Sequence, residues 1–165
     1  MSCYTAISVN TGVAMRTIVD FLGGDHRACD DLFASAEDAV AQKNWDSARG
    51  LFERFQKAMA HHLAMEEDVL FPAFEARTGM RMGPTEVMRT EHAQMRGLLQ
   101  EMAGAVASAD ENRYLGLSET LNMLMQQHNL KEENMLYPMS DQVLGSERDS
   151  VIRSMEAMPI QDAAP

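Results

Sequence analysis

The sequence predicts an all-α protein, an antiparallel up-down-up-down four-helix bundle with a short C-terminal helix. Apolar residues recur at alternating steps of three and four along four segments, which places them on one face of an α-helix. The connections between these segments are short, so neighbouring helices should run antiparallel. A pattern of histidine, glutamate and proline also recurs 66 residues later, so the chain consists of two related helical hairpins.

Each expected helix has recognisable ends. We expect the four helices at about residues 17–42, 46–77, 84–108 and 111–143. Gly79 suits the end of the second helix, and Pro84 suits the first turn of the third. Asp110 can cap the start of the fourth helix, and Gly145 can end it. A short terminal helix should then follow over residues 147–158.

The bulk composition suits a single domain. The chain has 165 residues, 45% of them hydrophobic, and we interpret residues 1–165 as one domain with a bundle at about 17–143, an N-terminal arm at 1–16 and a tail at 144–165. A net charge of −11 argues against nucleic acid or an anionic membrane as partner. Two cysteines form no disulfide framework, and the N-terminus is a poor signal peptide, so we expect a cytoplasmic protein, monomeric or dimeric.

The repeat puts polar residues on the faces that should be apolar. Four histidines and two glutamates fall in repeat register, and in each hairpin one His–Glu pair is spaced one helical turn apart, so that both side chains project from the same face. Burying them without partners would cost many kcal/mol, and bound cations remove this cost. The candidate metal ligands are His26, His62, Glu66, His92, His128 and Glu132.

The number and type of these ligands indicate which metal. Six nitrogen and oxygen donors are too many for one zinc ion and too rich in nitrogen for magnesium or calcium. They suit two first-row ions, for which iron is our first choice and manganese or zinc the alternatives. The two-fold repeat implies that Glu66 and Glu132 bridge the two ions.

The segments beyond the ligands carry further expectations. The apolar stripes continue through Val69 and Met135, and Pro72 and Pro138 should kink their helices just beyond the site. We place Trp45 in the first connection.

Several residues near the ligands receive a lesser role. We expect Glu67 and Glu133 to face solvent or to support the ligands from behind, and His61 to point away from them. Cys29 fits the core stripe. Tyr137 is matched by a phenylalanine in the first hairpin, which favours a role for its size over one for its hydroxyl.

The segments 25–27, 62–72, 91–92 and 128–138 together resemble the hemerythrin-like family, also called HHE cation-binding proteins, over about residues 17–143. The resemblance implies a hemerythrin-like bundle with a non-haem di-iron centre that reacts with dioxygen, nitric oxide or peroxide. We therefore expect a protein that binds dioxygen or nitric oxide in sensing or stress response. The alternatives are a di-iron enzyme that reduces nitric oxide or peroxide, and an iron donor in the repair of iron–sulfur clusters; a redox partner is not identified.

The chain departs from the oxygen carriers of this family at two positions. Carriers have a fifth histidine where this chain has Arg96, so one iron should hold solvent or stand open. Their second carboxylate corresponds to Glu133, whereas the His–Glu spacing here selects Glu132. The set of four histidines and two glutamates is more similar to a bacterial branch linked to nitric oxide stress and iron-centre repair. Members of that repair group carry an extra cysteine-containing N-terminal domain, and here about 16 residues with Cys3 precede the first helix.

Overall fold

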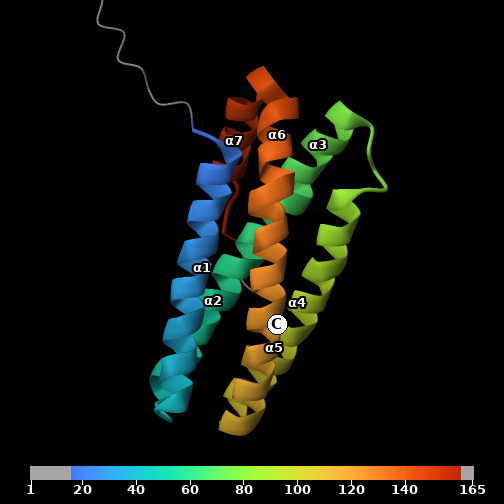
Figure 1. Ribbon diagram of the computed structural model, residues 1–165. Coiled ribbons are helices and arrows are strands. Elements are labelled where there is room, and N and C mark those ends of the chain that lie inside the picture. The colour runs from blue at the N-terminus through green and yellow to red at the C-terminus, as the bar shows by residue number, and fades with distance from the viewer. Residues whose placement is uncertain (1–15, 161–165) are drawn as a thin grey trace, which may run out of the picture.

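The computed structural model describes residues 16–160 and confirms the predicted fold class, because these residues form an all-helical bundle without strands (Figure 1). Cys3 and almost all of the expected N-terminal arm lie outside the described residues. The α-helices are α1 (Ile18–Ala41), α2 (Trp45–Met65), α3 (Phe71–Thr78), α4 (Pro84–Ala107), α5 (Glu111–Lys131), α6 (Tyr137–Leu144) and α7 (Arg148–Glu156). Single π-helical turns, η1 (Glu66–Leu70) and η2 (Glu132–Leu136), join α2 to α3 and α5 to α6, and a short 3-10 turn, η3 (Gly145–Glu147), precedes α7.

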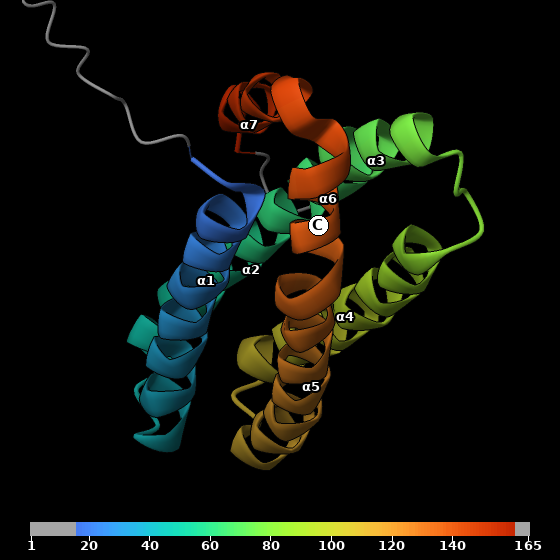
Figure 2. The same ribbon diagram turned by 45° about the horizontal axis from the view of Figure 1, so that its top comes forward.

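The four long helices alternate in direction, as the short connections predict (Figure 1). Helix α1 packs against α2 and α5, and α4 packs against the same two helices from the other side. Helix α7 covers the end of the bundle at which α1 begins, and there it contacts α1, α6 and η1 (Figure 2). Over residues 16–160, we find no helix with the length and apolar character needed to cross a lipid bilayer.

The helix ends form where the sequence predicts them. The Asp110 side chain accepts a hydrogen bond from the Arg113 amide and caps α5, and Pro84 is the first residue of α4. Gly79 adopts φ 74° at the end of α3, a left-handed conformation that costs glycine little. Trp45 was placed in the first connection but is the first residue of α2, where it packs against the core.

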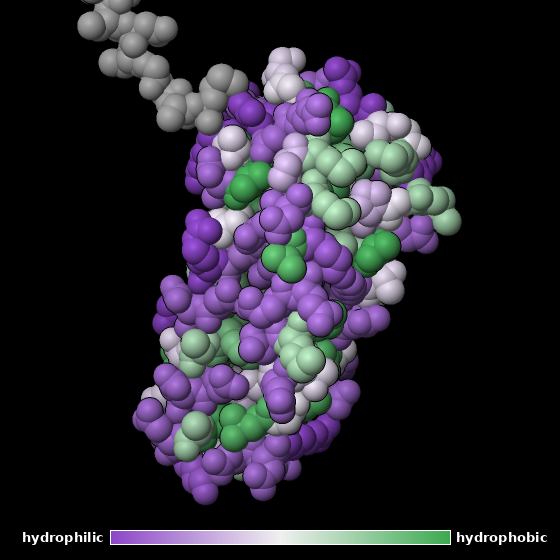
Figure 3. Space-filling model, in the orientation of Figure 1, coloured by the Kyte–Doolittle hydropathy of each residue, from purple (hydrophilic) through white to green (hydrophobic). Residues whose placement is uncertain are grey.

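Two apolar clusters fill the bundle, and the six polar residues separate them. One cluster, in the half of the bundle with the α1–α2 and α4–α5 connections, includes Phe33, Phe55 and Tyr114. The other, near α7, includes Phe71 and Tyr137. Outside, the face drawn in Figure 3 is mostly polar with scattered apolar side chains. Each long helix therefore passes from one apolar cluster through a buried polar layer to the other.

The π turns differ from the predicted continuous helices. In each, an amide bonds to the carbonyl five residues earlier, Phe71 to Glu66 and Tyr137 to Glu132. The wider turn inserts one residue, so the apolar stripe does not continue at the expected i+3 position. Met135 is 55% exposed and Val69 only partly buried.

The residues that follow the two π turns are buried instead of those that the stripe predicts. These residues are Leu70, Phe71, Leu136 and Tyr137. Near the two prolines expected to kink their helices, the structure has an irregular turn, which begins at the glutamates and ends two residues before Pro72 and Pro138. A proline lacks an amide hydrogen and repels the carbonyl four residues before it, and the π turn accommodates both effects.

Candidate metal centre

The structure brings the six predicted residues together between the two apolar clusters. Their donor atoms form two groups within each of which all atoms lie within 4.8 Å. The first group consists of His26, His62 and Glu132, and the second of Glu66, His92, His128 and Glu132. All six residues are at most 4% exposed. Four helices and both π turns therefore contribute to one buried cluster.

The two histidine pairs have the same geometry. In the first group the Nε2 atoms of His26 and His62 are 3.1 Å apart. In the second group those of His92 and His128 are 3.2 Å apart. The tilt between the rings is 59° in both pairs. The sequence repeat thus becomes a pseudo-two-fold arrangement of four imidazoles.

Each buried carboxylate reaches histidines of both groups. Glu132 places Oε2 3.2 Å from His26 Nε2 and Oε1 3.1 Å from His128 Nε2. Glu66 places Oε2 3.5 Å from His62 Nε2 and 3.2 Å from His92 Nε2. The two glutamates therefore span the two groups, as a bridging carboxylate would.

Four further carboxylates, the outer carboxylates, hold the histidines on the side away from the donor groups. In each imidazole the Nδ1 atom lies 2.8–2.9 Å from a carboxylate oxygen of a neighbouring helix. An ionised carboxylate only accepts, so Nδ1 carries the hydrogen and donates it. The four contacts join His26 to Glu133, His62 to Asp25, His92 to Glu67 and His128 to Glu91.

With this tautomer, the centre is suited to bind cations. With hydrogen on Nδ1, each neutral ring points an Nε2 lone pair into the cluster, and two lone pairs about 3.1 Å apart repel. Glu66 Oε2 and Glu132 Oε1 are also buried without a hydrogen-bond partner. A positive charge between these atoms, a proton or a metal ion, relieves both problems.

The electrostatics of the cluster favour positive charge. Burial lowers the pKa of His26, but its hydrogen bond to Glu132 and the nearby charges of Glu132, Glu133 and Glu66 raise that pKa to about 9. The pKa of His92 also reaches about 9, because Glu66 and Glu67 outweigh the effect of burial. A metal ion that binds here would displace the protons that the carboxylates otherwise attract.

The positions that differ from the oxygen carriers lie outside the donor groups. Glu133 holds His26 Nδ1 and is not a member of either group, whereas Glu132 belongs to both. Arg96 points outward and forms two hydrogen bonds, 2.8 and 2.9 Å long, with the Glu67 carboxylate. Burial raises the pKa of Glu67, but His92 and Arg96 lower it to about 2. Arg96 thus fixes the carboxylate that orients His92.

Sequence reasoning missed the role of the Tyr137 hydroxyl. The oxygen lies 2.7 Å from Glu66 Oε1, 2.9 Å from Glu132 Oε2 and 3.1 Å from His26 Nε2, and the residue is fully buried. The comparison with Phe71 obscured this contact, because a phenylalanine at the matched position suggests packing alone. The preceding π turn, which rotates residue 137 inward, leaves no residue-type signal of its own.

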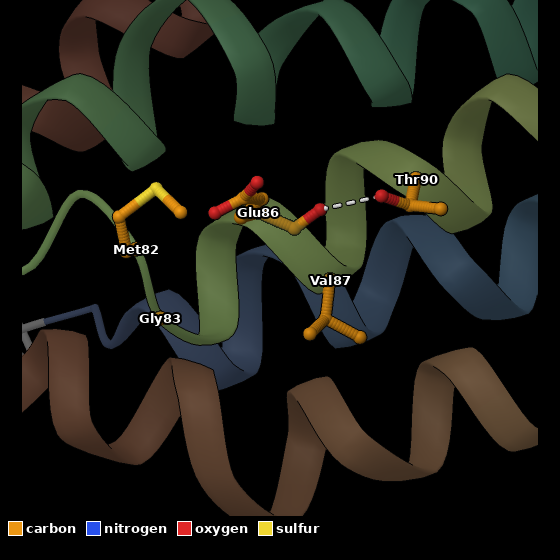
Figure 4. Close-up of a pocket in the computed structure, with 5 residues that line it drawn as sticks. All are labelled: Met82, Gly83, Glu86, Val87 and Thr90. Carbon is orange, nitrogen blue, oxygen red and sulfur yellow. Dashed lines mark hydrogen bonds between the residues drawn. The ribbon is translucent and has the colours of Figure 1, made fainter.

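Other candidates stand apart from the centre. His61 and Cys29 contribute no atom to either donor group. A shallow surface pocket lies at the start of α4, lined by Met82, Gly83, Glu86, Val87 and Thr90 (Figure 4). The Thr90 hydroxyl there bonds to the Glu86 carbonyl within the helix. The pocket shares no residue with the two donor groups.

Comparison with known proteins agrees with this geometry. A family model described as the hemerythrin HHE cation binding domain matches residues 17–140, which cover all six residues and the π turns. No curated protein and no solved structure gives a significant match.

Proposed function

Because the chain belongs to the hemerythrin HHE cation-binding family, we propose that it holds two iron ions and binds dioxygen or nitric oxide at them. His26 and His62 would hold one ion, His92 and His128 the other, and Glu66 and Glu132 would bridge the two. Bound ferrous iron supplies an electron-rich centre to which a diatomic gas can add. The oxygen and nitrogen donors also suit manganese or zinc, so metal identity is part of the test.

The surrounding residues prepare the site for this role. The outer carboxylates fix each imidazole tautomer and aim its Nε2 lone pair inward, so little reorganisation is needed when a cation enters. The apolar cluster on the α7 side, with Leu70 and Leu136 fully buried next to the glutamates, limits access of water. A small apolar gas passes such a barrier more readily than a charged solute.

One observation carries the proposal. Two fully buried glutamate oxygens have no hydrogen-bond partner, and four Nε2 atoms converge on the same space. In a protein without a cation, this arrangement would be costly and would serve no packing purpose.

Anaerobic reconstitution tests the proposal. Protein loaded separately with ferrous, manganous and zinc salts is desalted, its metal content is measured, and the ferrous form is titrated with nitric oxide and with dioxygen. We expect about two irons per chain, because six donors serve two ions better than one, and a change in the optical spectrum with either gas. One metal or fewer per chain, or an unchanged spectrum, contradicts the proposal. Consumption of many equivalents of nitric oxide or peroxide would show an enzyme instead.

A further inference from the structure

The two halves of the metal centre are not equivalent, because one aromatic pair differs. Tyr137 stacks on His26 with ring centroids 5.6 Å apart and an angle of 28°. Phe71, its partner in the repeat, stacks on His92 at 5.7 Å and 21°. Only the second hairpin therefore adds a hydroxyl, which it directs at the His26 side of the cluster.

The hydroxyl lies among more acceptors than one proton can satisfy. Its three neighbours, on Glu66, Glu132 and His26, all carry lone pairs when His26 holds its hydrogen on Nδ1. A phenol donates a single hydrogen bond, so one of its two carboxylate contacts brings lone pairs together, and the contact with His26 does so as well when that ring is neutral. Such crowding of lone pairs is expected around a cation and costs free energy without one.

The spacing of these atoms matches a coordination shell. Metal–donor bonds of about 2.1 Å in octahedral geometry place adjacent donors about 3 Å apart. The Tyr137 oxygen is 3.1 Å from His26 Nε2 and 2.9 Å from Glu132 Oε2, and these two atoms are themselves 3.2 Å apart. These three atoms thus have the mutual spacing of three ligands on one face of an ion.

The outer carboxylates show the same asymmetry. Behind the second histidine pair, Glu67 forms an ion pair with Arg96, and Glu91 forms one with Lys131. The residues that match Arg96 and Lys131 in the first hairpin are Asp30 and Met65, neither of them a cation. At these two positions, therefore, the second histidine pair has cations next to its outer carboxylates and the first has none.

From these observations, and resting on the proposed di-iron site, we propose that the Tyr137 oxygen is a seventh donor, bound to the ion that His26 and His62 hold. The added ligand would fill a position on that ion and leave the ion held by His92 and His128, on the side of Phe71, as the one open to a gas. When the phenol binds ferric iron it gives up its O–H proton, which leaves with the protons displaced from the histidines. No electron is transferred in that step.

Vibrational and visible spectroscopy test this assignment. Protein loaded with ferrous iron is oxidised with ferricyanide, its iron content is measured, and visible absorption and resonance Raman spectra are recorded. We expect a phenolate-to-iron absorption band with enhanced tyrosine ring vibrations. Tyr137→Phe should lose both signals and keep about two irons. Tyr114→Phe is the matched control, because Tyr114 is equally buried but lies in the other apolar cluster.

Nitric oxide gives an independent readout. The diferrous unmodified protein should bind a single equivalent per chain, and Tyr137→Phe, which frees a position on the first ion, should bind a second. Two bound irons without a tyrosine signal, or a signal that survives in Tyr137→Phe, overturns the assignment and leaves the proposed function intact. A protein that binds no metal overturns both. Should Tyr137→Phe fail to fold, Tyr4→Phe and Tyr114→Phe assign the signal by elimination, since the chain has three tyrosines.

Discussion

The first hairpin, α1 to α3, and the second, α4 to α6, share the residues that the proposed metal pair would need and differ at residues that would make its two members unequal. Each hairpin supplies two histidines, one buried glutamate that approaches histidines of both pairs, two outer carboxylates and a π turn that precedes a proline. The first hairpin has Phe71, Asp30 and Met65 at the positions where the second has Tyr137, Arg96 and Lys131.

This difference separates two kinds of constraint. The shared residues supply the donor atoms of the two groups or hydrogen-bond to the histidines, so we expect a change in one hairpin to unbalance the two proposed ions. Of the differing residues, Arg96 and Lys131 each contact one outer carboxylate of the second histidine pair, and the Tyr137 hydroxyl approaches His26 of the first pair but no other histidine. A duplicated site can therefore diverge at its edges while its centre stays symmetric.

Removal of a shared glutamate should have the largest effect. Glu132→Ala removes an oxygen from each donor group, so we expect metal content to fall to about one ion per chain or less. Glu133→Ala removes only the outer partner of His26 and should keep both ions at reduced affinity, by a factor of about 10–100. Elemental analysis after anaerobic loading compares the two. Should Glu133→Ala empty the site and Glu132→Ala leave it full, the spacing of the oxygen carriers would be correct.

Phe71→Tyr tests whether the hairpins can be made alike. The new hydroxyl should face the ion of His92 as Tyr137 faces that of His26, because the two rings stack on their histidines in the same way. We expect the phenolate-to-iron absorption per chain to rise by up to a factor of two, and nitric oxide uptake to fall. An unchanged absorption at full iron content would show that the two halves differ in more than this side chain.

Arg96→Met and Lys131→Met should shift the reduction potential slightly. Each change removes a cation from an outer carboxylate of the second histidine pair, so the oxidised ion is stabilised and the potential falls. A shift of about 10–40 mV is expected, since an exposed ion pair is worth ~0.2–1 kcal/mol and 59 mV is a tenfold change for one electron. Redox titration of the loaded protein measures it, with Arg54→Met, a change on α2 at a site with no assigned role, as the control. A rise in potential would contradict the charge argument.

The smallest effect is expected at Cys29, whose repeat partner is Met95. In the folded protein the Cys29 thiol should be as unreactive toward a thiol reagent as the methionine. Cys29 is 3% exposed, and burial, followed by the charges of Asp25 and Asp30, raises the pKa of its thiol to about 12. In a Cys3→Ser background the folded protein should therefore not react with a thiol reagent at pH 8, whereas the unfolded protein reacts fully. Rapid labelling of the folded protein would show that α1 opens near His26.

The repeat made the central residues predictable from the sequence. Histidine and glutamate at matched positions of two apolar helices have few explanations other than metal, and the structure brings all six together. The helix ends were also predictable, because Asp110, Pro84 and Gly79 act through local geometry.

The rest depended on packing that no local pattern reports. A π turn involves ordinary residues with near-helical backbone angles, so only the prolines that follow mark it. The strict stripe of threes and fours therefore predicted Val69 and Met135 in the core, one residue short of the correct position. The pairing of each outer carboxylate with a histidine on another helix also required the three-dimensional arrangement, although Asp25 and Glu91 repeat in the sequence.

The π turns also bear on where the helices of this chain can gain or lose residues. Each turn contains one residue more than an α-helical turn and accommodates it locally, so a single deletion within 67–70 would restore a regular helix and leave the buried side chains of α3 on the same face. A single deletion in the regular part of α2 would instead rotate the residues beyond it by about 100° relative to the core. A deletion at the tip of the α3–α4 connection, around Met82, would change only loop length. Single-residue length changes should thus be tolerated in this connection and at the two π turns, and least in the regular stretches of the long helices.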